Sequence, residues 1–433
     1  MSESGHARPM HARSVRRSRR PARSASCAAN APTAAGHSRA GLRLAFLSAA
    51  VSLVASFAAA AAPIPLYNIY RAEDGFTNPG ISMAIVTYSL GAIVGLLVLG
   101  RLSNHLGRKV PGIASLGLLL LGCLLLLNVH QIGVLLAARA FMGVGTGLAS
   151  SSLTSYIVDA APGKPRWLAS VASSQGPMLG LTIGAVASGA MVQFGQWPRQ
   201  LIFEVCAGFL LLCAALIVAS PETAAPMPGV WRSLLPRFGV PARVRPLLPA
   251  AGAIFVATWA TGAFYQAFVP ALVEDQLHTR SPLVLGLVFA SYMASSVLGA
   301  PLGGRLTALQ AQRVGMIVFV GGMNSAAAAI YNSSLPVFIV ATIVAGIGQG
   351  IALSAATRGL IEGTSIAERA PIFSAIYLLC YGGATILSLI AGGLSGTLPL
   401  PYIALGYGGL ALLAALFNIV RSPDLAGDRL VPR

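Results

Sequence analysis

The sequence has few charged residues. Asp, Glu, Lys and Arg make up only 9% of its 433 residues, whereas hydrophobic residues make up 55%. Soluble domains carry about 25% charged residues, because a surface in water needs them. A soluble globular enzyme and an intrinsically disordered chain are therefore both excluded. A protein with many membrane-spanning segments remains.

Cysteine is also scarce. The chain has five, and no two of them form a C-x-x-C pair. Four lie in apolar stretches, where cysteine packs as a small hydrophobic residue, so neither a disulfide framework nor a bound metal is expected. The phosphate-binding pattern G-x-x-x-x-G-K-[ST] is missing too, which argues against ATP as the energy source. Without clustered His, Asp or Cys in the apolar stretches, we expect no enzymatic activity and no cofactor.

The apolar residues form continuous stretches of about 20 residues, the length that a helix needs to cross a bilayer. They lack the alternation of apolar and polar residues that is typical of the strands of membrane β-barrels. We therefore predict an all-α membrane protein with twelve transmembrane helices in two pseudo-symmetric six-helix bundles. The predicted helices are 44–66, 81–100, 110–128, 133–157, 167–190, 201–219, 248–272, 282–303, 314–334, 336–357, 371–393 and 399–420.

Domain boundaries follow from these segments. We predict a disordered basic tail at 1–43, bundles at 44–220 and 247–421, a linker at 221–246 and a C-terminal tail at 422–433. The first tail contains nine Arg and is rich in Ser and Ala. Its composition also resembles a transit peptide, and an over-extended gene start is a further alternative. It has no interleaved aromatic residues, so we do not expect it to bind nucleic acid.

Lys and Arg fall mainly on one side of the predicted membrane. With the N-terminal tail inside, the inside segments contain about 25 of the 29 basic residues. The outside segments contain Arg71, Arg199 and Arg280. Because basic loops stay in the cytoplasm, we predict that both termini are cytoplasmic. We expect a multi-pass protein of a bacterial inner (plasma) membrane.

The two halves of the chain repeat each other. Residues 143–159 read GVGTGLASSSLTSYIVD and residues 346–362 read GIGQGIALSAATRGLIE, an offset of 203. Near the second and eighth segments the offset is 204, and basic loop residues such as Arg101 and Arg305 coincide. Parallel six-helix repeats are typical of transporters whose halves rock around a site near the middle of the membrane.

The loop after the second segment reads GRLSNHLGRK, and it resembles the G-x-x-x-D-R-x-G-R-[RK] signature of the major facilitator superfamily (MFS). Gly100, Gly107, Arg108 and Lys109 match, whereas Asn104 replaces the acidic residue. The resemblance implies a cytoplasmic latch whose charges hold one half against the other in one state. We expect this latch to be weak, because Asn104 keeps a hydrogen-bonding group but has no charge.

Two further motifs lie within segments. The fourth segment contains RAFMGVGTG, Arg139 to Gly147, which resembles the family's R-x-x-x-G-x-G element. Its Gly143 and Gly147 are one helical turn apart and should form a smooth packing face. The fifth segment contains Gly176 and Pro177, which partly resemble the Gly-Pro motif of the family's antiporters. The resemblance extends over about residues 44 to 421. The sequences PIPLYNIY at Pro63–Tyr70 and Pro221-Glu222-Thr223 after the sixth segment are common in bacterial members that resemble drug exporters, although the latter also ends spans in sugar porters.

Charged residues inside spans cost about 2.5–3.5 kcal/mol each, so they point to function. Arg139 and Glu204 are the two such residues here, and we identify them as proton-coupling candidates. They belong to one half and lie roughly 9 and 5 Å from the outer ends of their helices, so a contact between them, direct or through water, is possible.

The family resemblance also implies which helices surround the substrate, namely the first, fourth, seventh and tenth. Polar and aromatic residues on these helices are the candidates for substrate contact. They are Tyr67, Thr154, Trp259, Tyr265, Gln266 and Gln349, and Tyr88, Gln175, Tyr292, Tyr377 and Tyr381 lie on the flanking helices.

Together, these features predict a secondary active transporter that moves a small organic solute by alternating access. We expect proton-coupled efflux, and the alternative is proton-linked uptake of a sugar or organic acid. A sensor with a transporter-like fold is a different possibility. The expected partners are a small-molecule substrate, protons and the lipid bilayer, and the protein is expected to act as a monomer.

Overall fold

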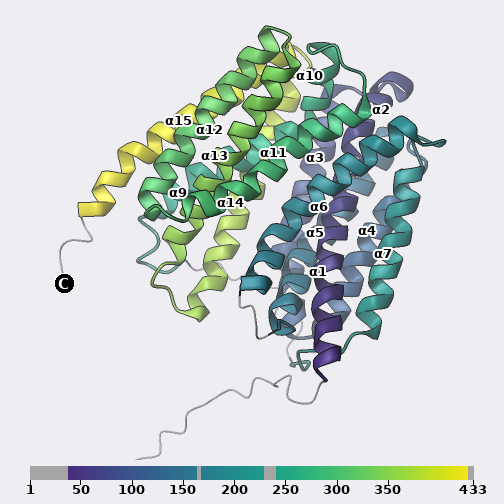
Figure 1. Cartoon of the computed structure of the whole chain (residues 1–433), viewed down its shortest axis with the longest axis vertical. Coiled ribbons are helices and arrows are strands. Elements are labelled where there is room, and N and C mark those ends of the chain that lie inside the picture. The colour runs from purple at the N-terminus through teal and green to yellow at the C-terminus, as the bar shows by residue number, and fades with distance from the viewer. Residues whose placement is uncertain (1–37, 163–166, 229–239, 428–433) are drawn as a thin grey trace, which may run out of the picture.

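The computed structural model describes residues 38–162, 167–228 and 240–427, coloured in Figure 1. Within these ranges the chain forms helices and no strands. Twelve of the helices are long and apolar enough to cross a membrane, which confirms the predicted all-α membrane fold. The predicted disordered tail falls largely on residues 1–37, outside the described ranges.

The N-terminal half contains six of these spans. It packs α1, α4 and α7 together on one side, and α3 and α6 contact the other half. Its elements are α1 (Arg39–Ala61), η1 (Ile64–Leu66), α2 (Tyr67–Asp74), α3 (Asn78–Ile93), the π-helical turn η2 (Val94–Leu99), η3 (Gly100–Asn104), α4 (Lys109–Leu126), α5 (Ile132–Asp159), α6 (Trp167–Phe194) and α7 (Leu201–Ala219).

The C-terminal half has the corresponding arrangement: α15 packs on α9 and α12, and α11 and α14 lie against the first half. The main contacts between the two halves are those of α6 with α11 and of α3 with α14. The elements are α9 (Leu248–Ala267), α10 (Val269–Asp275), α11 (Pro282–Gly303), α12 (Ala308–Tyr331), α13 (Leu335–Ile361), α14 (Ile366–Leu394) and α15 (Leu400–Gly427).

The bundle has two ends. We call the end where α1 begins and α15 finishes the terminal face, and the end that carries α2 and α10 the opposite face. Figure 1 shows α2 and α10 at the top, far from the start of α1. The first helix of each half is broken at the opposite face, where prolines such as Pro63, Pro65 and Pro270 lack the N–H that would continue a helix.

The helix limits differ from the predicted ones at several ends. Helix α1 begins at Arg39 rather than at residue 44, because the Ser38 side chain accepts a hydrogen bond from the Gly41 N–H at 3.1 Å and caps the helix. The first span also runs on through η1 and α2 to Asp74. At the other end of the chain, α15 continues to Gly427 and includes part of the predicted C-terminal tail.

Glycines let α3 and α5 approach each other closely. A Cβ added to Gly143 would lie only 2.1 Å from the Tyr88 carbonyl oxygen of α3, and one at Gly147 would lie 2.4 Å from that of Ala92. The second half repeats the arrangement, since Gly346 of α13 lies against the Tyr292 carbonyl of α11. This close packing fixes the position of Tyr88 beside α5.

Candidate functional site

The two halves are joined at the opposite face. The Asn68 side chain donates to the Pro270 carbonyl at 2.8 Å, and Arg71 of α2 forms an ion pair with Asp275 of α10 at 3.0 Å. Below them, the Ser82 hydroxyl of α3 donates to the Ser388 carbonyl of α14 at 2.7 Å. These contacts close the space between the halves at this end of the bundle.

Arg199, in the loop before α7, fastens α2 to its own half. Its guanidinium donates to Glu73 at 2.7 Å and to Asp74 at 2.6 Å, and it lies 5.1 Å from the centre of the Tyr70 ring. Desolvation alone would lower the pKa of Arg199, but the hydrogen bonds to Asp74 and Glu73 raise the pKa above its usual value. The charge on Arg199 therefore persists, and α2 is held to the N-terminal half.

A cavity of about 290 Å³ lies between the halves on the terminal side of these contacts. All the residues found to line it, within the described ranges, are uncharged. The lining residues are Phe57, Tyr88, Ser89, Ser150, Thr154, Ser173, Ser174, Pro177, Met178, Leu181, Thr258, Trp259, Gly262, Ala263, Gln266, Met293, Gln349, Leu353, Thr357, Phe373, Ile376, Tyr377, Cys380, Tyr381 and Ala384. Such a mainly apolar pocket with a few polar groups is typical of a small-molecule site.

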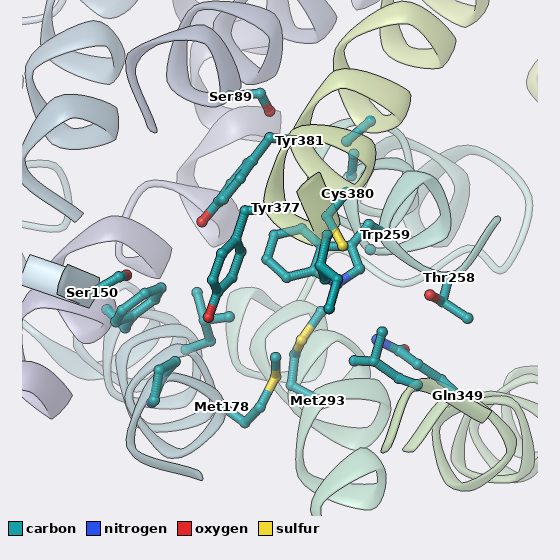
Figure 2. Close-up of a pocket in the computed structure, with 18 of the residues that line it drawn as sticks. Ser89, Ser150, Met178, Thr258, Trp259, Met293, Gln349, Tyr377, Cys380 and Tyr381 are labelled. Atoms are coloured by element: carbon teal, nitrogen blue, oxygen red, sulfur yellow. The ribbon is translucent and has the colours of Figure 1, made fainter. Parts of the chain in front are cut away.

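Aromatic rings form one wall of the cavity. The Trp259 ring of α9 meets the Tyr381 ring of α14 edge to face at 4.6 Å between centroids, and meets Tyr377 at 6.4 Å. Figure 2 shows these rings together, with Met178 and Met293 nearby. Edge-to-face contacts hold the rings in place. The wall therefore offers a rigid apolar surface to a ring or a chain.

The structure places four of the six predicted substrate-contact residues in the cavity lining: Thr154, Trp259, Gln266 and Gln349. Tyr67 and Tyr265 are instead buried in packing. The Tyr265 ring stacks on Tyr292 at 4.3 Å, and its hydroxyl is 2.9 Å from that of Thr342. Of the flanking residues, Tyr88, Tyr377 and Tyr381 line the cavity.

Several lining residues were not among the candidates. Helix α14 contributes Phe373, Ile376, Cys380 and Ala384, and α6 contributes Met178 among others. The α14 residues recur three or four positions apart, so they share one face of the helix. The spacing in the sequence marks one face of α14, but only the structure shows that this face meets the cavity.

Arg139 is fully buried behind the cavity lining. Its Nη1 donates to the Ala60 carbonyl of α1 at 2.6 Å, and its Nη2 donates to Gln266 Oε1 of α9 at 3.2 Å. Its guanidinium carbon lies 4.4 Å from the centre of the Tyr88 ring, in a cation–π contact. Arg139 therefore connects the two halves at the end of the cavity nearest the opposite face.

The structure does not show a direct contact between Arg139 and Glu204. Glu204 lies exposed in the first turn of α7, which packs on α4 and α1 at the edge of the N-terminal half. Among the described residues, no ion pair joins it to Arg139. Their positions along the chain could not show that the two side chains face different directions.

The predicted latch makes its contacts within the N-terminal half. Arg108 Nε donates to Asp159 at the end of α5 at 2.7 Å, and Arg108 Nη1 donates to Asn104 Oδ1 at 3.0 Å. The ammonium group of Lys109 donates to the Val218 carbonyl at 2.7 Å. In this conformation the contacts found for Arg108 and Lys109 join α4, α5 and α7, and they do not cross to the described part of the other half.

Glu222, just after α7, belongs to the Pro221-Glu222-Thr223 pattern of the sequence, but it was not among the predicted latch residues. Its carboxylate accepts the backbone N–H groups of Arg108 at 2.8 Å and Lys109 at 3.0 Å, at the start of α4. Gly107 makes this possible, because its φ is +83° and a Cβ there would lie 2.7 Å from Glu222 Oε2. The negative charge also interacts favourably with the N-terminal end of the helix dipole.

Among the described residues, no group of three or more His, Cys, Asp or Glu side chains is arranged to hold a metal ion. The features that stand out are two pseudo-equivalent bundles, a cavity lined by both, and closure at one end. They define a multi-pass membrane protein of the solute-transporter class. A family model described as Major Facilitator Superfamily matches residues 44–278, more than half of the chain, and the chain belongs to this superfamily.

Curated relatives are similar over shorter stretches. A probable glucose transporter of Neurospora crassa is 30% identical over 100 residues, which cover 22% of this chain and 16% of the relative. An MFS efflux transporter of Aspergillus oryzae is 28% identical over 166 residues, covering 38% of this chain and 30% of the relative. The matched stretches thus span less than a third of either relative.

Solved structures match over nearly the whole length. A transporter of the POT family, crystallised with a thioalcohol-conjugated peptide, superimposes with a TM-score of 0.70 at 13% identity. The match covers 89% of this chain and 96% of the other. At this identity the likeness shows the fold alone.

Proposed function

We propose that the protein is a secondary active transporter that moves a small organic solute by alternating access. The cavity carries this proposal: both halves line it, contacts at the opposite face close it, and it reaches residues near the terminal ends of α6 and α14, such as Ser173 and Phe373. A second conformation, closed at the terminal face and open at the opposite face, would complete the cycle.

The test is to prevent the halves from separating at the opposite face. Arg71 and Asp275 are replaced by cysteine in a background without the native cysteines, and a short bifunctional thiol reagent joins them. Flux of a panel of labelled solutes into proteoliposomes should stop and should recover when the link is reduced. Arg280 and Glu274, 3.5 Å apart within one half, are the matched control pair. Unchanged flux with α2 linked to α10 would contradict alternating access.

The proposed orientation places the terminal face in the cytoplasm of a bacterial cell, with the protein in the inner membrane. The asymmetric distribution of Lys and Arg supports it. A single cysteine in the loop near Arg280 should react with an impermeant reagent added to intact cells, whereas one near Arg243 should not. The reverse pattern would overturn the orientation.

We propose export coupled to proton entry, by a monomer that contains its own complete cavity. Arg139 is the first coupling candidate because it bridges α1, α5 and α9. Glu204 remains the second, although it lies apart from Arg139. Uphill flux under an imposed pH gradient tests both. Wild-type flux and pH dependence in Glu204→Gln would remove Glu204 as a coupling site.

The alternative is proton-linked uptake of a sugar or an organic acid, and one observation favours an organic acid as the solute. The hydrogen-bond partners found for the buried Arg139 guanidinium are uncharged, so its positive charge is suited to an acidic solute. The sign of transport decides between the two directions. Accumulation inside right-side-out vesicles with an acidic exterior would indicate uptake, and extrusion under the same gradient would indicate efflux.

A further inference from the structure

Arg139 is a buried positive charge whose partners, including the Tyr88 ring at 4.4 Å, are neutral. Its side chain has no exposure to solvent, and its hydrogen bonds go to the neutral oxygens of Ala60 and Gln266. The Nε atom is buried and has no hydrogen-bond partner among the described residues. A buried charge is strongly unfavourable unless an opposite charge or a complete set of hydrogen bonds compensates it. This guanidinium therefore has unused capacity to bind an anion.

The surroundings of the cavity do not supply that anion. All the residues found to line it are uncharged, and Glu204 is exposed on the outer helix α7. The acidic residues nearest the opposite face already have partners, since Asp74 binds Arg199 and Asp275 binds Arg71. Within the described residues, the charge closest to the cavity is thus the positive charge of Arg139, and no carboxylate pairs with it.

Gln266 lies between Arg139 and the cavity. It belongs to the other half of the protein, it lines the cavity, and its Oε1 accepts from Arg139 Nη2 at the rather long distance of 3.2 Å. A carboxylate oxygen in the same place would form a charge-assisted hydrogen bond, which is shorter and about twice as strong as a neutral one. A carboxylate in the cavity can therefore displace the Gln266 amide with a gain in binding energy.

We propose that the cavity binds an organic anion, with one carboxylate on an apolar or aromatic body, and that Arg139 binds the carboxylate in place of Gln266. The body lies along the wall formed by Trp259 and Tyr377, which are 6.4 Å apart between centroids. Organic cations are disfavoured, because Arg139 repels them where water is largely excluded. This inference names the substrate class of the proposed transporter and rests on that function.

Binding is measured at equilibrium, without any gradient, by calorimetry on the full chain in lipid nanodiscs. The ligands are matched sets in which one body carries a carboxylate, a carboxamide or an ammonium group: indole-3-acetate, indole-3-acetamide and tryptamine, with the corresponding phenyl, naphthyl and octyl sets. A charge-assisted hydrogen bond predicts that the carboxylate of at least one set binds about tenfold or more tightly than its carboxamide. The ammonium member should bind most weakly.

Variants then test whether Arg139 is responsible. In Arg139→Gln, the carboxylate-to-carboxamide ratio should fall close to one, and Arg139→Lys should restore a preference for the carboxylate. Gln266→Glu leaves Arg139 in place but gives it an internal carboxylate, so it should also abolish the preference. The exposed Arg280→Gln, which removes a positive charge far from the cavity lining, is the matched control and should leave the ratio unchanged.

The outcomes separate this inference from the proposed function. If no carboxylate binds, if carboxamides bind equally well, or if Gln266→Glu keeps the preference, the inference is wrong whether or not the protein transports solutes. If the carboxylate preference is present and depends on Arg139, but crosslinking α2 to α10 leaves flux unchanged, the site is correct and the transport mechanism is wrong.

Discussion

Replacing Gly143 by alanine should disturb the contact between α3 and α5. The added Cβ would lie 2.1 Å from the Tyr88 carbonyl oxygen and 3.0 Å from the Tyr88 Cα, both of which are backbone atoms. Ordinary contact begins near 3.4 Å, so the two helices must separate locally by about 1.3 Å (3.4 − 2.1). Side-chain rotation cannot relieve this overlap.

The expected cost is that of overpacking a tight interface, about 1–3 kcal/mol of stability. Moving α3 away from α5 also affects the candidate site, because the Tyr88 ring of α3 lies 4.4 Å from the guanidinium carbon of Arg139. Gly143→Ala should therefore lower the unfolding temperature and also weaken ligand binding that depends on Arg139.

Stability is measured by thermal unfolding in detergent. A dye that reacts with thiols reports the exposure of buried cysteines such as Cys123. Gly133→Ala in the same helix and Gly117→Ala in the middle of α4 are matched controls, because no atom lies within 4 Å of a Cβ added at either position. Both should unfold near the wild-type temperature. If Gly143→Ala unfolded with them, the close packing of α3 on α5 would not limit stability.

Three further predictions concern the two ends of the bundle. Asn104→Asp should strengthen the existing bond to Arg108 by up to about 1.5–3 kcal/mol and raise the unfolding temperature; a lower temperature would contradict this. Glu222→Gln should lose about 0.3–1 kcal/mol of stability, because it removes a negative charge at the start of α4, and an unchanged denaturation curve would argue against that role. A double-mutant cycle on Arg71 and Asp275 should give a coupling of about 0.2–1 kcal/mol that decreases in high salt; salt-independent coupling would rule out an exposed ion pair.

Much of the fold followed from short-range features of the chain. The continuous apolar stretches located all twelve spans, because the thickness of a bilayer sets the length of a helix that crosses it. The predicted helix limits were wrong only at helix ends, where local capping determines the last helical residue. The Ser38 cap extended α1, and the prolines near Pro63 divided the first span. Such ends depend on a few hydrogen bonds that hydropathy does not register.

The candidate site was recovered only in part. Four of six substrate-contact candidates line the cavity, whereas Tyr265 packs on Tyr292. In a membrane protein, lipid and protein interior are both apolar, so a span has little amphipathic pattern to show which of its faces meets the substrate. The chain order of the residues therefore did not distinguish a cavity tyrosine from a packing one.

The sequence by itself determined the class of protein, the twelve spans, the internal repeat and the glycine packing face of the fourth span. Each of these depends on composition or on residues close together in the chain. Only the tertiary structure decided that Arg139 meets Gln266 of the other half, 127 positions away, and that Glu204 faces outward from α7. Those pairings depend on how each helix is rotated about its axis within the bundle. That rotation results from packing between helices distant in sequence, such as the contact of Gly143 with Tyr88.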